Sequence, residues 1–180
     1  LFFLVAPLVG LAQDKISVSL YQDSRLLFLG DDSSNKAGTI DLLARFKIYG
    51  NQSEYGYFTL NTEYEQANIQ EVYKRISLNV GYTFTTFYIR GLHFTDNIEL
   101  TTTFGYGKIY RHSNNTNNWS VTGEVAYNLN EWLQFGIINQ FTKRTDLMYK
   151  YQTDTIRYSV FFGFEFKIFQ FDKRPVCYSY

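Results

Sequence analysis

Histidine and cysteine, the side chains most often used as base and nucleophile near neutral pH, are rare in this sequence. There are two histidines, His93 and His112, and one cysteine, Cys177. His112 precedes Ser113, and other polar segments contain aspartates that could complete a nucleophile–base–acid set: Asp31, Asp32 and Asp146. Such a set is what an acyltransferase or deacylase requires. Because polar loops often bring these residue types together by chance, we expect His112 to be a solvated loop residue and the protein not to be an enzyme. A lipid-modifying enzyme is the alternative.

Metal and cofactor chemistry have little support in the residue pattern. The two histidines are far apart in the sequence, and a single cysteine cannot build a multi-cysteine zinc site. Asp31 and Asp32 lack the regular spacing of oxygen ligands found in a Ca²⁺ loop. No glycine-rich phosphate loop is present. We therefore predict no metal site and no cofactor, and we expect Cys177 to be a free thiol.

Composition narrows the class of protein further. The chain has 180 residues, 17 Lys+Arg against 17 Asp+Glu, and 19% aromatic residues. The balanced charge argues against a nucleic-acid partner bound by a basic field. The many aromatic residues argue against disorder. The length suits one domain, and a mean hydropathy of −0.25 does not suit a helical membrane protein.

The first twelve residues differ from the rest of the chain. Residues 1–12 read LFFLVAPLVGLA, an uncharged run that is shorter than the roughly 20 residues of a membrane-spanning helix. The run ends in Gly10-Leu11-Ala12, which suits cleavage by a signal peptidase before Gln13. We interpret it as the remnant of a secretory signal peptide. The predicted organisation is this remnant (1–12), a β-barrel domain (13–171) and a C-terminal tail (172–180).

Apolar and polar residues alternate along almost the whole mature chain. Ile40, Leu42, Ala44, Phe46 and Ile48 share one parity, for example, and this period of two indicates a strand with one apolar face. No window has a convincing helical period. The pattern predicts an all-β fold, an antiparallel up-and-down transmembrane β-barrel of eight strands, near 16–29, 40–48, 55–64, 72–84, 98–110, 119–129, 131–143 and 156–168.

The links between these strands fall into two groups. Links 30–38, 65–71, 111–118 and 144–153 would share one end of the barrel, and links 50–54, 85–97 and 128–130 would share the other. The first group is mostly longer and more polar, as in outer-membrane barrels with long outward loops and short periplasmic turns. The segment 85–97 is too long for a short turn, so it either extends the hairpin or adds a small flap.

Alternation alone does not tell which face of the barrel is outside. The apolar parity has too many large side chains for the interior of an eight-stranded barrel, among them Phe46, Phe104 and Phe164. The polar parity has the small residues that a narrow lumen needs, including Gly81, Gly105 and Gly163. We therefore predict an apolar outer face in contact with lipid. The alternative is a soluble exported barrel that encloses an apolar ligand.

The polar parity would then line the lumen with charged side chains. Five acids and five bases are expected there: Asp41, Arg45, Lys47, Glu63, Arg75, Glu99, Glu124, Arg157, Glu165 and Lys167. Buried charges are costly unless they are paired and hydrogen-bonded. A selective channel would favour an excess of one sign. The balanced set predicts a plugged lumen without an open pore.

Tyrosine and tryptophan cluster near the predicted strand ends. Amphipathic rings favour the headgroup level of a membrane, so these residues are interpreted as two aromatic girdles. The members are Tyr49, Tyr57, Tyr64, Tyr82, Tyr106, Tyr110, Trp119, Tyr127 and Trp132. The alternative, a stacking platform for a sugar or a nucleic acid, fits the balanced charge less well.

The last predicted strand, Tyr158-Ser159-Val160-Phe161-Phe162-Gly163-Phe164-Glu165-Phe166-Lys167-Ile168-Phe169, is rich in Phe. With the eight alternating strands, it resembles small bacterial outer-membrane β-barrels of the OmpA/OmpX type. The segments SLYQDSRLLFLGDD, AGTIDLLARFKIYGNQSEYGYF and YKRISLNVGYTF are similar to uncharacterised barrels of Bacteroidota. The resemblance implies a location in the bacterial outer membrane and insertion by the barrel assembly machinery.

That machinery reads a final strand that ends in an aromatic residue. The tail 172–180 departs from this pattern, although Phe169 or Phe171 could serve internally. The expected partners are the lipid bilayer of the outer membrane and the assembly machinery, with no nucleic acid, and the expected oligomeric state is a monomer.

Overall fold

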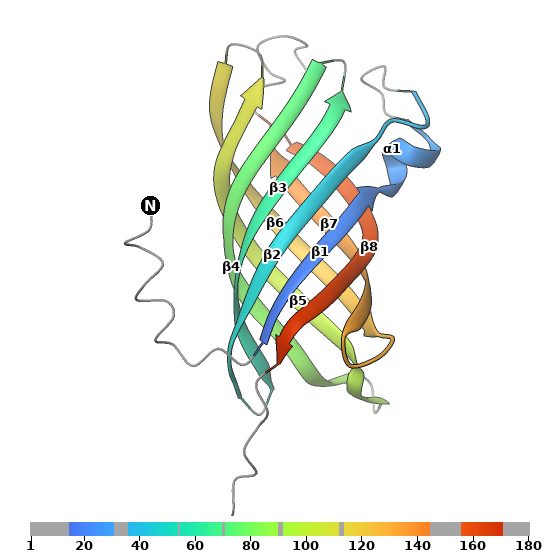
Figure 1. Ribbon diagram of the computed structural model, residues 1–180, viewed down its shortest axis with the longest axis vertical. Coiled ribbons are helices and arrows are strands. Elements are labelled where there is room, and N and C mark those ends of the chain that lie inside the picture. Colours follow the sequence, from blue (N-terminus) through green and yellow to red (C-terminus); the bar gives the residue numbers. More distant parts are fainter. Residues whose placement is uncertain are drawn as a thin grey trace, which may run out of the picture.

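The computed structural model describes residues 15–30, 36–53, 55–69, 71–89, 92–111, 114–144 and 156–170. These residues form one closed antiparallel barrel in the order β1 to β8, with strand β1 paired to strand β8. Figure 1 shows the strands tilted around a common axis, with the short helix α1 at one rim. The strands are β1 (Lys15–Asp23), β2 (Asp41–Gln52), β3 (Gly56–Ile69), β4 (Glu71–Ile89), β5 (Leu92–Arg111), β6 (Asn114–Asn128), β7 (Leu133–Lys143) and β8 (Ile156–Gln170). The predicted all-β barrel of eight antiparallel strands is confirmed.

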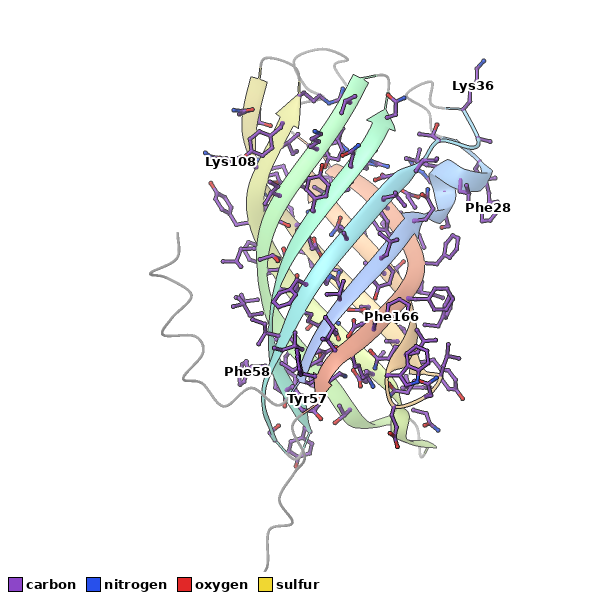
Figure 2. All side chains as sticks on the ribbon, viewed as in Figure 1. Phe28, Lys36, Tyr57, Phe58, Lys108 and Phe166 are labelled. Atoms are coloured by element: carbon purple, nitrogen blue, oxygen red, sulfur yellow. The ribbon has the colours of Figure 1, made fainter. Side chains whose placement is uncertain are left out.

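The two faces of the barrel have opposite chemistry. Large apolar side chains such as Phe58, Leu78 and Phe104 are exposed, whereas Glu63, Arg75 and other polar groups are fully buried inside. Figure 2 shows Phe58 and Lys108 pointing away from the barrel. The prediction that the apolar parity lies outside is therefore correct. The alternative with an apolar ligand inside does not fit, because polar and charged side chains fill most of the interior.

Small residues on the inward face give the large side chains room. Gly136 on β7 faces the lumen, and a Cβ atom added there would lie 2.9 Å from the hydroxyl of Tyr21 on β1. At this distance the tyrosine ring would have to shift. Gly81, Gly105 and Gly163 also lie on the inward parity, as predicted. A narrow barrel can hold buried Arg and Tyr side chains only where other inward positions lack a side chain.

The helix α1 (Ser24–Phe28) was not predicted, because the segment 16–29 was expected to be strand throughout. The side chain of Asp23 caps it by accepting hydrogen bonds from the backbone N–H groups of Arg25 (2.8 Å) and Leu26 (3.2 Å). Leu26 is fully buried against Ala67, Tyr73 and Ile109. A helix of five residues is too short to show a helical hydrophobic period, so only the cap could have indicated it. None of the helices in the described part of the chain is long and apolar enough to cross a membrane.

Several predicted links are strand instead. β3 continues to Ile69, β4 starts at Glu71 and β6 starts at Asn114, so 65–71 and 111–118 are mostly paired backbone. In the segment 85–97 the hairpin is extended, with Phe87 opposite Phe94 and Ile89 opposite Leu92, after an irregularity between Phe84 and Thr86. Polar residues hid the extensions at 65–71 and 111–118, because strand pairing beyond an apolar belt does not require apolar side chains.

Candidate functional site in the charged interior

A continuous ladder of ion pairs fills the barrel interior. Acids and bases alternate along it: Glu165, Lys47, Glu124, Arg45, Glu63, Arg75, Glu65, Arg157 and then both Asp23 and Asp41. We call this set the lumen ladder. Its members come from six of the eight strands, because inward parity on every strand delivers polar side chains to the same narrow space.

The centre of the lumen ladder is Arg45. Its Nη2 atom lies 2.7 Å from Oε1 of Glu63, which is directly opposite on the neighbouring strand β3. Its Nη1 atom donates to Oε2 of Glu124 at 2.8 Å. Glu124 is on β6, four strands from β2 in the closed order, so this bond joins opposite walls of the barrel. The guanidinium fork allows both contacts at once, which a single ammonium would not do with the same geometry.

In the part of the lumen ladder near the start of β1 and the end of β8, Lys47 joins two carboxylates. Its ammonium donates to Glu165 (2.8 Å) and to Glu124 (3.1 Å). The hydroxyl of Tyr49 also donates to Glu165, at 2.6 Å. A separate pair, Lys15 with Glu99 at 3.2 Å, lies close by, since the Lys15 ammonium is 4.2 Å from the centre of the Tyr49 ring. Charge-assisted hydrogen bonds therefore connect several strands in this part of the lumen.

The part near α1 is built on two arginines. Arg75 donates through Nε to Glu65 (2.6 Å) and through Nη2 to Glu63 (3.0 Å). Arg157 on β8 donates through Nη2 to Asp41 (2.9 Å) and Asp23 (3.1 Å). Asp23 therefore has two roles, because its Oδ1 caps α1 and its Oδ2 binds Arg157.

Gln140, and the contact of Arg144 with Tyr73, complete the interior beside the lumen ladder. Gln140 on β7 accepts from Arg75 (2.9 Å) and donates to Glu63 (3.2 Å), which ties β7 to β3 and β4. The guanidinium carbon of Arg144 lies 3.9 Å from the centre of the Tyr73 ring, a cation–π distance. Arg144 is 1% exposed, so its charge is also withdrawn from solvent.

All ten side chains predicted for the lumen face inward. Nine of them are in ion pairs, and Lys167 instead donates to the side-chain oxygen of Asn128 at 2.7 Å. The prediction missed Lys15, Asp23 and Glu65, which are also buried and paired. Parity would have found them, because Glu65 shares the parity of Glu63, and Lys15 and Asp23 share that of Ser17 and Ser19. Lys15 and Glu65 were missed because they lie beyond the predicted strand ends, whereas Asp23 was missed although it lies within the predicted strand 16–29.

Two of the nine residues assigned to the aromatic girdles were assigned wrongly. Tyr49 is fully buried in the lumen and bonded to Glu165, and the ring of Tyr57 packs edge-on against it at 5.7 Å. Both lie on the inward parity, and being close to a strand end does not determine the face of a residue. The other seven lie on the outward parity or in an exposed turn: Tyr64, Tyr82, Tyr106, Tyr110, Trp119, Tyr127 and Trp132.

The residues considered for catalysis lie outside the described part of the structure. This applies to His112, Ser113, Asp31, Asp32 and Asp146, and also to Cys177, the tail and residues 1–12. His93 is within β5, but its side chain is not described. Among the residues that are described, no group of three or more His, Cys, Asp or Glu side chains has the arrangement of a metal site.

The sequence and the fold differ in what they resemble among known proteins. No known protein-family model and no curated protein matches the sequence. Among solved structures, the crystal structure of Neisserial surface protein A is similar, with a TM-score of 0.51 and 8% sequence identity over 86% of this chain and 96% of that one. At this identity the likeness concerns the fold alone. The expected fold class, a small closed barrel of eight antiparallel strands, is confirmed.

Proposed function

We propose that the protein is an outer-membrane β-barrel with a structural or surface-interaction role and a plugged lumen that does not conduct ions. The lumen ladder is the observation that carries this proposal. It combines an interior crossed by a chain of buried ion pairs with an apolar outer wall, an inside-out arrangement that suits lipid around the barrel and not water.

The outer wall supports the membrane part of the proposal. Aromatic residues face outward near both ends of the strands, with Tyr106 and Tyr110 toward one end and Tyr127 and Trp132 toward the other. Between them, outward positions such as Leu78, Val80 and Phe104 are apolar and more than half exposed. Exposed apolar surface of this extent is costly in water and favourable in lipid. The aromatic rings would form girdles at the two interfaces.

The contacts across the lumen support the absence of a pore. Arg45 to Glu124 and Lys15 to Glu99 each join strands four apart in the closed order, so they cross the full width of the barrel. An ion passing through would have to displace buried pairs, and breaking such a pair leaves an uncompensated buried charge. The interior can therefore stabilise the barrel and keep it closed, and interaction with other molecules would take place at the outer loops.

Two measurements test this proposal. Membrane fractionation of expressing cells, with an electrophoretic mobility that differs between unheated and boiled samples, would report an inserted and folded barrel. Planar bilayers containing the purified protein should then show no large, steady single-channel currents. Recovery in the soluble periplasmic fraction would refute the membrane location, and steady currents would refute the plugged lumen.

A further inference from the structure

Charged side chains are unevenly distributed between the two faces of the strands. Among the strand residues whose side chains are described, every Asp and Glu faces the lumen. The outward faces have only three charged residues, the lysines Lys74, Lys108 and Lys143. All three are near the rim that also holds α1. Near this rim, the described outward strand faces therefore present positive charge at the edge of the apolar wall.

Two of these lysines form a pair on adjacent strands. Lys74 on β4 is directly opposite Tyr110 on β5, and Lys108 on β5 is directly opposite Ile76 on β4. The two lysines are thus diagonal neighbours on one face, a relation with a spacing of about 7–8 Å. Both are exposed, and neither has a carboxylate partner among the residues described. Two like charges this close favour an anion that lies between them. Figure 2 shows Lys108 pointing outward near this rim.

An apolar groove begins beside this lysine pair. It has a volume of about 380 Å³, and its lining includes Leu20, Leu42, Ala44, Tyr64, Gln66 and Val72. Gln66 is directly opposite Lys74 on the neighbouring strand, and Val72 is two residues from Lys74 on the same strand. The small side chain of Ala44, between Leu42 and Phe46 on the outward face of β2, leaves part of this space open. Groove and lysine pair are therefore continuous on the outer wall.

We propose that this surface binds a phosphorylated glycolipid of the outer leaflet, with its phosphates at Lys74 and Lys108 and acyl chains in the groove. The inference rests on the proposed membrane location, with the α1 rim facing outward. Charge complementarity selects the headgroup, because the outward strand faces described here present Lys and no carboxylate. The phenol of Tyr110, exposed beside Lys74, can donate a further hydrogen bond to a phosphate oxygen. The apolar lining of the groove fits acyl chains and not a soluble anion.

The test uses the full mature chain in phosphatidylcholine nanodiscs that contain a small fraction of diphosphoryl lipid A. Native mass spectrometry of the released protein counts the retained lipid A molecules. We expect lipid A to be retained over phosphatidylcholine. In Lys74→Gln/Lys108→Gln, retention should fall about tenfold to thirtyfold, since each basic side chain near a charged lipid surface is worth about a factor of five. Dephosphorylated lipid A should show the same loss with the unaltered protein.

A matched control is the substitution Lys143→Gln, which removes an outward lysine on β7, three strands from β4. Retention by this variant should stay at the level of the unaltered protein. A second variant, Ala44→Phe, fills the groove without changing any charge and should also lower retention. Equal retention of lipid A by the double lysine variant and the unaltered protein would overturn the proposal, as would equal losses in Lys143→Gln and the double variant.

Failure of this inference can be told apart from failure of the proposed function. Each variant is first checked for the mobility difference between unheated and boiled samples, which reports an intact barrel in the nanodisc. An inserted barrel without preference for lipid A refutes only the glycolipid surface. A chain that fails to insert in its unaltered form refutes the membrane location itself.

Discussion

The Nη2 atom of Arg45 lies 2.7 Å from Oε1 of Glu63, and both side chains are completely buried in the barrel. The two residues are directly opposite on β2 and β3, so strand register alone brings them together. Glu63 also accepts from Arg75 and Gln140, and Arg45 also binds Glu124 on the opposite wall. This pair therefore holds two neighbouring strands together and, through the bond of Arg45 to Glu124, is connected to the opposite wall of the barrel.

Removal of the Glu63 charge should be strongly destabilising. In Glu63→Gln the shape of the side chain is kept, but Arg45 and Arg75 lose a shared carboxylate in a site without solvent. We expect the free energy of unfolding to fall by about 3–5 kcal/mol, as when one partner of a buried pair is removed. Urea unfolding in lipid vesicles, followed by Trp fluorescence, measures this. The outward neighbour Thr62→Val should change stability by less than about 0.5 kcal/mol. A similar small effect for Glu63→Gln would contradict the structural role of the ladder.

Removal of a contact across the lumen should open a path for ions. Arg45→Ala/Glu124→Ala deletes both partners of one contact between β2 and β6, and the space becomes available to water. The charges that lose a partner keep another one, because Lys47 still pairs with Glu165 and Glu63 still pairs with Arg75. We expect measurable conductance in planar bilayers where the unaltered protein shows none. The control Lys108→Ala/Lys143→Ala changes two charges on the outer wall and should remain silent. Identical silence of both double variants would mean that the plug does not depend on the ladder.

A charged side chain on the outer wall should lower the free energy of unfolding by an amount that depends on its depth in the membrane. Leu78 lies near the middle of β4 and faces outward, whereas Ile156 is outward at the first residue of β8. Arginine at the midplane of a membrane barrel costs about 2–4 kcal/mol, and near an interface about 0–1 kcal/mol. Leu78→Arg should therefore destabilise the barrel in vesicles much more than Ile156→Arg. Equal unfolding free energies for the two variants would argue against a lipid-embedded belt at Leu78.

The two roles of Asp23 can be separated by substitution. In Asp23→Asn the cap of α1 is kept, because Asn is a good N-cap residue, but the charge that pairs with Arg157 is lost. In Asp23→Ala both are lost, and the cap alone contributes about 1 kcal/mol. Hydrogen exchange at the amides of Arg25 and Leu26 should be slow in the first variant and fast in the second. Fast exchange in both variants would show that the ion pair with Arg157, and not the cap, holds α1.

Much of the fold could be predicted because a barrel strand shows its two faces directly in the sequence. Alternation placed Phe46 and Glu63 on opposite faces, and the large side chains that share the parity of Phe46 assigned its face to the outside. Strand ends were harder to predict. Polar residues such as Asn68 and Asn115 remain paired with the neighbouring strand, because backbone hydrogen bonds extend a strand wherever such a neighbour is present.

The sequence by itself determined, through parity and the size of the side chains on each parity, that most charges lie inside and most phenylalanines outside. Only the tertiary structure decided which charges meet. Arg45 and Glu124 are far apart along the chain and come together because β2 and β6 face each other across a closed barrel. Tyr49 is the counterpart among the aromatic residues. Its type suited a membrane girdle, but it lies on the inward parity, and its hydroxyl donates to the buried carboxylate of Glu165, two strands away in the closed order. It is part of the interior because a buried carboxylate is stabilised by a hydrogen-bond donor.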